Sequence, residues 1–272
     1  MIIDFCAYLG TWPLYSLPIR DAATLVERMD RCGIAVAFVS NVEGLLLLNP
    51  QEANERLVRM VEGHRNRLLP VGTANPTLGS CQADVREAVE RWNLAGFRLS
   101  PNYHGYAFDS DVAVGLANLL AEYQRPLFVA ASVDEERFQH PALRVSPVPV
   151  ASMVELIRHA PRTVIVLNNL FVEEALSILQ QPGLPLDNVL MDVTAMDKPF
   201  DGLAQVLRHS GSAHLVYGSQ APFLYPEATL ALIQENRFAE TDVRAILVGN
   251  GSRHPTLARW IQSGHSYPVV AA

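Results

Sequence analysis

The chain begins with Met1-Ile2-Ile3-Asp4-Phe5-Cys6-Ala7-Tyr8-Leu9-Gly10, an apolar run that ends at a glycine. Alternate side chains of a strand point to the same face, so we expect Asp4, Cys6 and Tyr8 on one face of a buried strand. The opposite face is then formed by Ile3, Phe5 and Ala7. Polar or reactive side chains at the end of a buried strand indicate a functional site, whereas a small thiol and an aromatic ring also serve as packing.

Further runs of this kind follow along the whole chain, and a helical pattern comes after each one. The expected strands cover residues 2–8, 34–40, 68–73, 95–99, 126–131, 163–168, 188–193 and 214–219. The expected amphipathic helices cover residues 21–31, 51–62, 82–92, 110–123, 151–159, 172–180, 200–209 and 227–235. Strands that are apolar on both faces are typical of parallel sheets covered by helices. The alternation therefore predicts an α/β fold, a single (β/α)8 TIM barrel that spans residues 1–272.

Composition narrows the class of protein and partner. The chain has 272 residues, 49% of them hydrophobic, with a formal net charge of -7. No basic patch or run is visible, which argues against a nucleic-acid partner, and no apolar run approaches membrane-spanning length. We expect a cytoplasmic protein with a small-molecule ligand, and homo-oligomerisation stays open. The 3 cysteines are scattered and predict neither a disulfide framework nor a zinc motif.

In a barrel of this kind the functional site lies at the C-terminal ends of the strands. The side chains expected there are mostly polar or aromatic, and few of them ionise. The ionisable ones are Cys6, Arg98, His104 and Asp192, with Lys198 in the loop beyond. The uncharged candidates for ligand contact are Tyr8, Trp12, Tyr103, Asn168, Asn169 and Gln220. Lys198 is the only lysine of the chain, and the pattern assigns no role to it.

Three motifs carry a resemblance to a known family. They are Gly96-Phe97-Arg98-Leu99-Ser100-Pro101, Gly218-Ser219-Gln220-Ala221-Pro222-Phe223 and Ile246-Leu247-Val248-Gly249-Asn250-Gly251-Ser252-Arg253. Together with the loop through Tyr106, they resemble the amidohydrolase-related (amidohydrolase-2) family. This family consists of TIM-barrel hydrolases and decarboxylases of the amidohydrolase superfamily. The resemblance runs from the first strand to about Arg253 and implies the same barrel.

The resemblance also implies a metal site, which this sequence has altered. The family binds a divalent metal through Asp-x-His-x-His on the first strand, a histidine on each of the fifth and sixth strands, and an aspartate on the eighth. The residues that stand at these positions are Asp4, Cys6, Tyr8, Ala130, Asn169 (or Asn168) and Gln220. Zinc and similar ions need several histidine, cysteine or carboxylate donors around them. We therefore expect no metal at this position, and no cofactor.

The first functional hypothesis is a hydrolase that cleaves a C–O or C–N bond of a lactone, ester or amide without a metal. The substrate would be a small carboxylated metabolite held by Arg98. His104 would act as general acid or base, and Cys6 as a nucleophile. Asn169 and Gln220 would hold the developing oxyanion. The expected substrate contacts are Tyr8, Trp12, Tyr103, Asn168, Asn169, Asp192 and Gln220.

Two other hypotheses use the same residues. The chain could be a catalytically inactive descendant that binds a small molecule or a protein partner, because apolar and amide replacements remove buried charges that need partners. Alternatively, a metal could bind at a shifted site made of Cys6, His104 and Asp192. Structural roles also stay open for the candidates: Arg98 could pair with Asp192 inside the barrel, and His104 could be an ordinary loop side chain.

Overall fold

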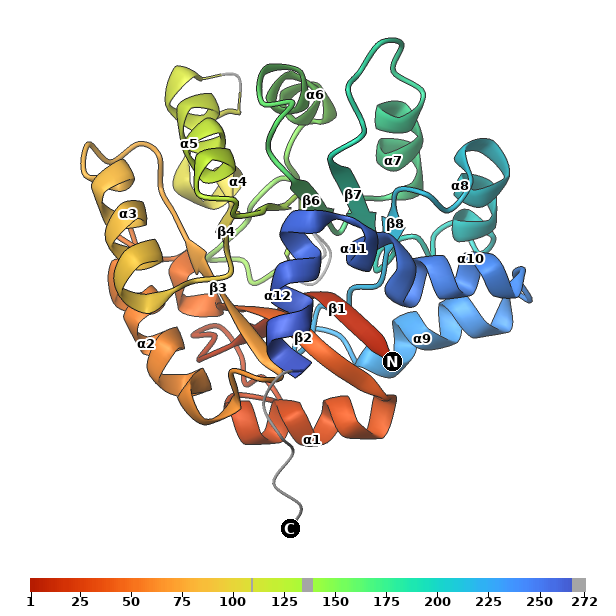
Figure 1. The fold of residues 1–272 in the computed structure, drawn as a ribbon, viewed down its shortest axis with the longest axis horizontal. Helices are drawn as coiled ribbons and strands as arrows, with labels where there is room; N and C mark the ends of the chain where they lie inside the picture. Colours follow the sequence, from red (N-terminus) through yellow and green to blue (C-terminus); the bar gives the residue numbers. More distant parts are fainter. Residues whose placement is uncertain (109, 134–138, 266–272) are drawn as a thin grey trace.

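Eight parallel strands form one sheet in the order β1 to β8 in the computed structural model, which describes residues 1–108, 110–133 and 139–265 (Figure 1). The strands are β1 (Ile2–Leu9), β2 (Ile34–Asn41), β3 (Leu68–Thr73), β4 (Gly96–Leu99), β5 (Leu127–Ala130), β6 (Ile165–Asn168), β7 (Val189–Asp192) and β8 (Leu215–Val216). The backbone N–H of Phe5 donates to Tyr217 O at 3.0 Å, and that of Tyr8 donates to Ala221 O at 2.7 Å. These bonds join β1 to the segment after β8, so the predicted barrel is confirmed.

Helices surround the strands. They are α1 (Ala22–Cys32), α2 (Gln51–Val61), α3 (Cys81–Trp92), α4 (Pro101–His104), α5 (Asp111–Glu122), α6 (Val150–His159), α7 (Val172–Leu179), α8 (Gly202–Ser210), α9 (Pro226–Glu235), α10 (Glu240–Arg244), α11 (Asn250–Arg253) and α12 (Pro255–His265). Those from α1 to α3 and from α5 to α9 match the predicted amphipathic segments, whereas α4 and α10 to α12 were not predicted. Two short 3₁₀ helices cover Val42–Leu45 and Glu62–His64, and a π-helix covers Ala245–Gly249. None of the helices in the described part of the chain is long and apolar enough to cross a membrane.

Local sequence explains where these helices begin and end. In α1, the Asp21 side chain accepts a hydrogen bond from the Thr24 backbone N–H at 2.8 Å, which caps the first turn. Gly33 follows the helix with φ of 69°, a left-handed conformation that glycine adopts without steric cost. The buried side chains Leu25 and Met29 lie one turn apart and face the sheet.

The alternation predicted for β1 is only partly correct. Ile3 and Phe5 pack in the barrel interior, and so do Cys6 and Tyr8, whereas Ala7 belongs to the layer between strands and helices. The pairing of β1 with β2 shifts register between Asp4 and Ala7. Such an irregularity lets two consecutive residues point to the same side. The expectation that Phe5 and Cys6 lie on opposite faces is therefore wrong.

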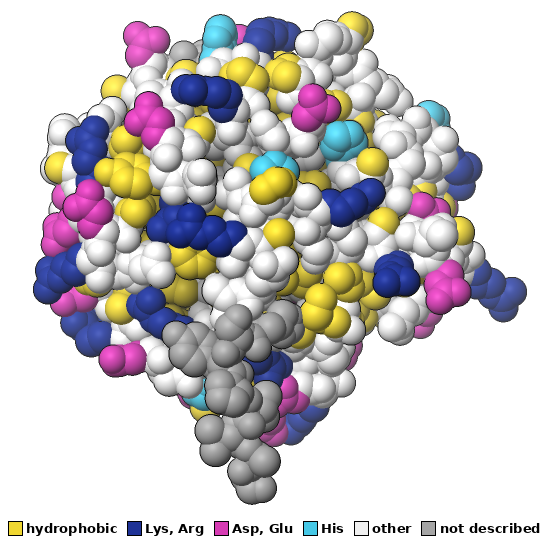
Figure 2. Space-filling model, in the orientation of Figure 1, with side chains coloured by type: hydrophobic (Ala, Val, Ile, Leu, Met, Phe, Trp, Pro, Cys, Tyr) yellow, Lys and Arg dark blue, Asp and Glu magenta, His cyan; other side chains and the backbone are white. Residues whose placement is uncertain are grey.

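Helix α12 closes the N-terminal end of the barrel. Leu257, Trp260 and Ile261 of this helix pack against apolar side chains of the lower barrel interior, among them Ile3 and Leu69. Figure 1 looks onto this end, where α12 crosses the centre of the ring of strands. On the same face, Figure 2 shows acidic and basic side chains interspersed without a large patch of one sign. The opposite end, where the strands finish, is left for a site.

Candidate functional site

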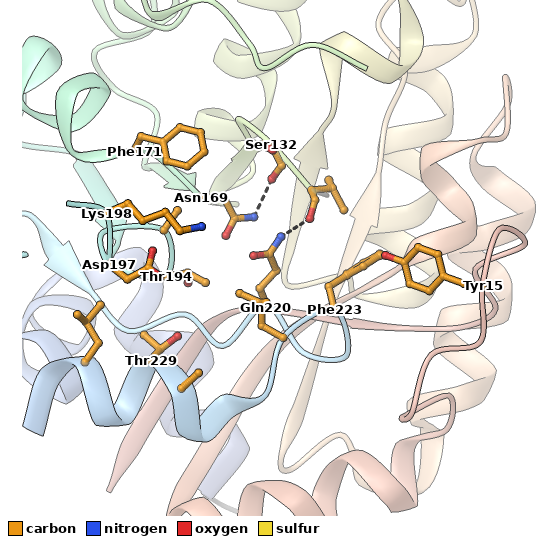
Figure 3. Close-up of a pocket in the computed structure, with 15 residues that line it drawn as sticks. Tyr15, Ser132, Asn169, Phe171, Thr194, Asp197, Lys198, Gln220, Phe223 and Thr229 are labelled. Carbon is orange, nitrogen blue, oxygen red and sulfur yellow. Dashed lines mark hydrogen bonds between the residues drawn. The ribbon is translucent and has the colours of Figure 1, made fainter. Parts of the chain in front are cut away.

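A cavity of about 580 Å³ opens at the C-terminal ends of the strands (Figure 3). Its walls come from the segments that follow β1, β5, β6, β7 and β8, and from α9. The lining residues are Tyr15, Ser132, Val133, Asn169, Phe171, Thr194, Ala195, Asp197, Lys198, Gln220, Phe223, Leu224, Ala228, Thr229 and Leu232. The end of the barrel that the sequence indicated therefore holds a cavity large enough for a small molecule.

Two of the predicted contact residues, Asn169 and Gln220, lie in the cavity wall. Asn169 directly follows β6, and Gln220 lies in the segment after β8. Both have a positive φ, 62° for Asn169 and 53° for Gln220. Left-handed conformations of residues other than glycine are uncommon and concentrate at functional sites. Asn169 Nδ2 donates to Ser132 O at 2.7 Å, and Gln220 Nε2 donates to Val133 O. Both amides are thus held against the loop that follows β5.

Lys198 is a wall residue to which the sequence analysis assigned no role. Figure 3 shows its amine directed into the cavity, on the side where Asn169 lies. Asp197 and Thr194 belong to the same segment after β7, and Thr194 Oγ1 donates to Gly218 O at 2.8 Å. The sequence held one indication of a role for Lys198: it is the only lysine of the chain, and it stands shortly after a strand end. Its approach to the cavity depends on how the loop folds back.

Arg98 lies beneath the cavity, inside the barrel, and is 1% exposed. Its guanidinium group faces the backbone carbonyls of Ala7 and Phe5, at 3.4 Å and 3.5 Å. The guanidinium carbon is 4.4 Å from the centroid of the Tyr8 ring, within the range of a cation–π contact. Cys6 is fully buried in the same interior region. Arg98, Cys6 and Tyr8 are therefore brought together, although none of them lines the cavity.

Asp192, at the end of β7, is buried and organises the residues around it. Its carboxylate accepts hydrogen bonds from Asn168 Nδ2 at 2.8 Å and from the backbone N–H groups of Asn169 and Thr194, both at 3.1 Å. Burial raises the pKa of Asp192 above its ordinary value, against the lowering effect of these bonds. Asn168 also donates to Phe5 O at 3.3 Å. Asp192 and Asn168 thus support the cavity wall from behind.

Asp4 is a second buried carboxyl group, and it lies on β1 beside the segment after β8. Its Oδ1 accepts from the backbone N–H groups of Ser219 at 2.9 Å and Cys6 at 3.0 Å. Burial outweighs these bonds and raises the pKa of Asp4 to about 7. The side chain therefore ties the first strand to the last and titrates near neutral pH.

The remaining predicted residues lie farther from the cavity. His104 ends the short helix α4, and its Nε2 is 3.1 Å from Gly44 O. Burial lowers the pKa of His104, which favours the neutral imidazole. The rings of Trp12 and Phe223 pack edge to face with their centroids 5.6 Å apart, so Trp12 lies one layer behind the cavity wall. Tyr103 packs against the same interior cluster as Trp12.

The residues at the family's metal-ligand positions do not fit a divalent cation. Burial raises the pKa of the Cys6 thiol and of the Tyr8 phenol, so both groups are neutral near pH 7. Among the other positions, Asp4 is a carboxyl group that already accepts from two backbone N–H groups. Ala130 offers only a methyl group, and Asn169 and Gln220 offer neutral amides. No group of three or more His, Cys, Asp or Glu side chains in the described ranges could hold a metal ion, so Cys6, His104 and Asp192 do not form a shifted site.

Solved structures share the fold of this chain, although their sequences differ widely from it. No protein-family model and no curated protein matches this sequence. A 2,6-dihydroxybenzoate decarboxylase structure from Rhizobium is similar, with 12% identity and a TM-score of 0.71 over 95% of this chain and 98% of its own. A structure described as amidohydrolase II has 15% identity and a TM-score of 0.71 over 95% of this chain and 100% of its own.

A third similar structure is a dihydroxybenzoic acid decarboxylase from Polaromonas sp. JS666, solved with bound manganese and the inhibitor 2-nitroresorcinol. It has 13% identity and a TM-score of 0.69 over 94% of this chain and 96% of its own. At such identities the likeness establishes the fold alone. The chain has the TIM-barrel fold of amidohydrolase-superfamily decarboxylases and amidohydrolases, as the resemblance in the sequence implied.

Proposed function

We propose that this protein binds a small carboxylated metabolite in the cavity at the C-terminal end of the barrel, and that it does so without a metal. One observation carries the proposal: the cavity wall holds a lysine together with amide and hydroxyl groups, while the family's metal-ligand positions carry residues that do not fit a metal. A lysine in a partly enclosed cavity attracts an anion more strongly than a lysine in open solvent does.

The chemistry of the other wall residues supports a ligand with an apolar body. Phe171, Phe223 and Leu232 line the cavity and offer apolar surface, which favours binding through the hydrophobic effect. Two of the similar structures are named for decarboxylases of dihydroxybenzoate compounds, which are themselves carboxylated. A carboxylate on an apolar frame is therefore the ligand class that we propose.

Hydrolysis of a lactone, ester or amide is the second candidate, and the pair Asp197 and Lys198 favours it. Both side chains line the cavity, and a carboxyl and an amine are groups that serve in general acid–base catalysis. The residues predicted to be catalytic, Cys6, Arg98 and His104, lie outside the cavity wall. The amides of Asn169 and Gln220 already donate to backbone carbonyls, which leaves each one further N–H for an oxyanion. Binding is therefore the function that the geometry supports best.

Thermal shift with a panel of small carboxylates and their methyl esters tests the proposal. The purified protein is measured before and after dialysis against EDTA, and its zinc and manganese content is determined. We expect carboxylates to raise the melting temperature, the esters to have less effect, and chelation to change neither result. Stoichiometric metal in the protein, with the response lost on chelation, would overturn the proposal. Turnover of lactones or p-nitrophenyl esters would favour the second candidate.

A further inference from the structure

We infer that Lys198 and Asn169 together select the ligand. Lys198 pairs with its carboxylate, and Asn169 Oδ1 accepts a hydrogen bond from a hydroxyl or N–H group on the same molecule. This inference rests on the proposed function, which names a carboxylate but no residue that binds it and no second polar group. It predicts a bifunctional ligand.

Asn169 presents a buried hydrogen-bond acceptor in the cavity wall, and its side chain is held in place. The residue is 3% exposed, and its Oδ1 has no hydrogen-bond partner among the residues that the structure describes. The side chain cannot turn freely to find one, because Nδ2 donates to Ser132 O at 2.7 Å. The backbone is held as well, since the Asn169 N–H donates to Asp192 Oδ1 at 3.1 Å and φ is 62°. A buried acceptor left without a donor is costly, so a ligand that brings one gains affinity.

Lys198 supplies the charge that a carboxylate needs. It is the single basic residue among those that line this cavity in the described chain, and Asp197 is the single acidic one. Figure 3 shows the amine directed into the cavity, while Asp197 lies lower on the same segment. A lysine ammonium group forms charge-assisted hydrogen bonds with carboxylates, and the cavity of about 580 Å³ has room for a ligand that carries one.

The two groups have different consequences for specificity. A site built to receive a hydrogen-bond donor discriminates strongly against an analogue that lacks one, because the acceptor is then left unpaired. A charge pair with Lys198 discriminates between an acid and its neutral ester, and the discrimination weakens as salt is added. The apolar walls bind both analogues about equally, so each polar group can be tested by itself.

The test uses 3-(4-hydroxyphenyl)propionate, its methyl ester, and 3-(4-methoxyphenyl)propionate as probes in titration calorimetry. The ester lacks the carboxylate, and the methoxy compound lacks the donor. We expect Lys198→Met to weaken binding of the acid about tenfold while the ester binds as it does to the unchanged protein. We expect Asn169→Gly, which suits the positive φ, to weaken binding of the hydroxyl probe but not of the methoxy probe.

Matched variants control for charge and backbone. Arg59→Met removes an exposed cation of α2, and Asn93→Gly replaces another asparagine of positive φ, 50°, after α3. Neither residue lines the cavity, so both variants should bind every probe normally. As the only lysine, Lys198 can also be followed directly: after reductive ¹³C-methylation its signal should shift with the acid and not with the ester.

The outcomes separate the inference from the proposed function. If the unchanged protein binds the acid but Lys198→Met binds it equally well, the role of Lys198 is refuted and the proposed function stands. If Asn169→Gly weakens both phenolic and methoxy probes alike, the selective role of Asn169 is refuted. If the unchanged protein binds neither acid, the carboxylate class itself is refuted, and the inference falls with it.

Discussion

Replacing Asp4 with asparagine should remove a pH dependence of stability that the fold creates. Burial raises the pKa of Asp4 from 3.8 to about 7, so the folded protein retains this proton over a pH range where the unfolded chain has lost it. Between these two pKa values the folded state binds more protons, and its stability therefore falls as the pH rises. The contribution of Asp4 is fully present below pH 3.8 and is lost as the pH rises through about 7.

The magnitude follows from the two pKa values. The linkage relation gives a loss of about 2 kcal/mol from the free energy of unfolding between pH 5 and pH 7. In Asp4→Asn, the amide oxygen can still accept from the backbone N–H groups of Cys6 and Ser219, but the side chain does not titrate. The difference in free energy of unfolding between variant and unchanged protein should therefore shift by about 2 kcal/mol in favour of the variant over this range.

Urea denaturation at half-unit pH steps from 5 to 8 measures this difference. Asp187→Asn, which neutralises an exposed carboxylate before β7, serves as the control and should show no comparable shift. A difference between Asp4→Asn and the unchanged protein that stays constant across the range would refute the raised pKa. A difference that moves in the opposite direction would mean that the Asp4 carboxylate is stabilised, rather than opposed, by its surroundings.

Three further predictions concern Gly218, Arg98 and His104. A Cβ at Gly218 would lie 2.8 Å from Asp192 Oδ2, so Gly218→Ala should lower the free energy of unfolding by about 2 kcal/mol in urea denaturation. Gly63 has open space around it, so Gly63→Ala should leave this free energy nearly unchanged. Arg98→Met should lower the free energy of unfolding by about 3 kcal/mol, because it leaves buried polar groups without their cation; an unchanged value would mean that the guanidinium is not needed there. Because His104 does not line the cavity, His104→Ala should change the affinity of carboxylate probes less than twofold in calorimetry. A marked loss of binding or turnover would instead support its predicted catalytic role.

The barrel could be predicted because its signals are local. Each strand is a short apolar run and each helix an amphipathic segment, and both patterns are legible within a dozen residues. The positions of Asn169 and Gln220 at the cavity were also predictable, since strand ends meet on one face of any parallel barrel. The helices α4 and α10 to α12 were not predicted, and the closure of the barrel floor by α12 arises from contacts between distant parts of the chain.

The site itself depends on features that no local pattern carries. The register shift in β1 turns Phe5 and Cys6 to the same side, although strict alternation would separate them. Arg98 stands at a strand end, as expected, but its side chain turns inward beneath the cavity and packs on Tyr8. Lys198 stood out only as the single lysine, and the fold of the loop after β7 brings it to the wall.

The amino-acid sequence by itself therefore determined the number and order of the strands and the end of the barrel at which the cavity opens. Tertiary structure alone decided that Lys198 reaches the cavity wall and that Cys6 and Arg98 are buried outside it. The physical reason is that periodicity reports the face of an element, whereas exposure to a cavity is set by packing between elements that are distant in sequence.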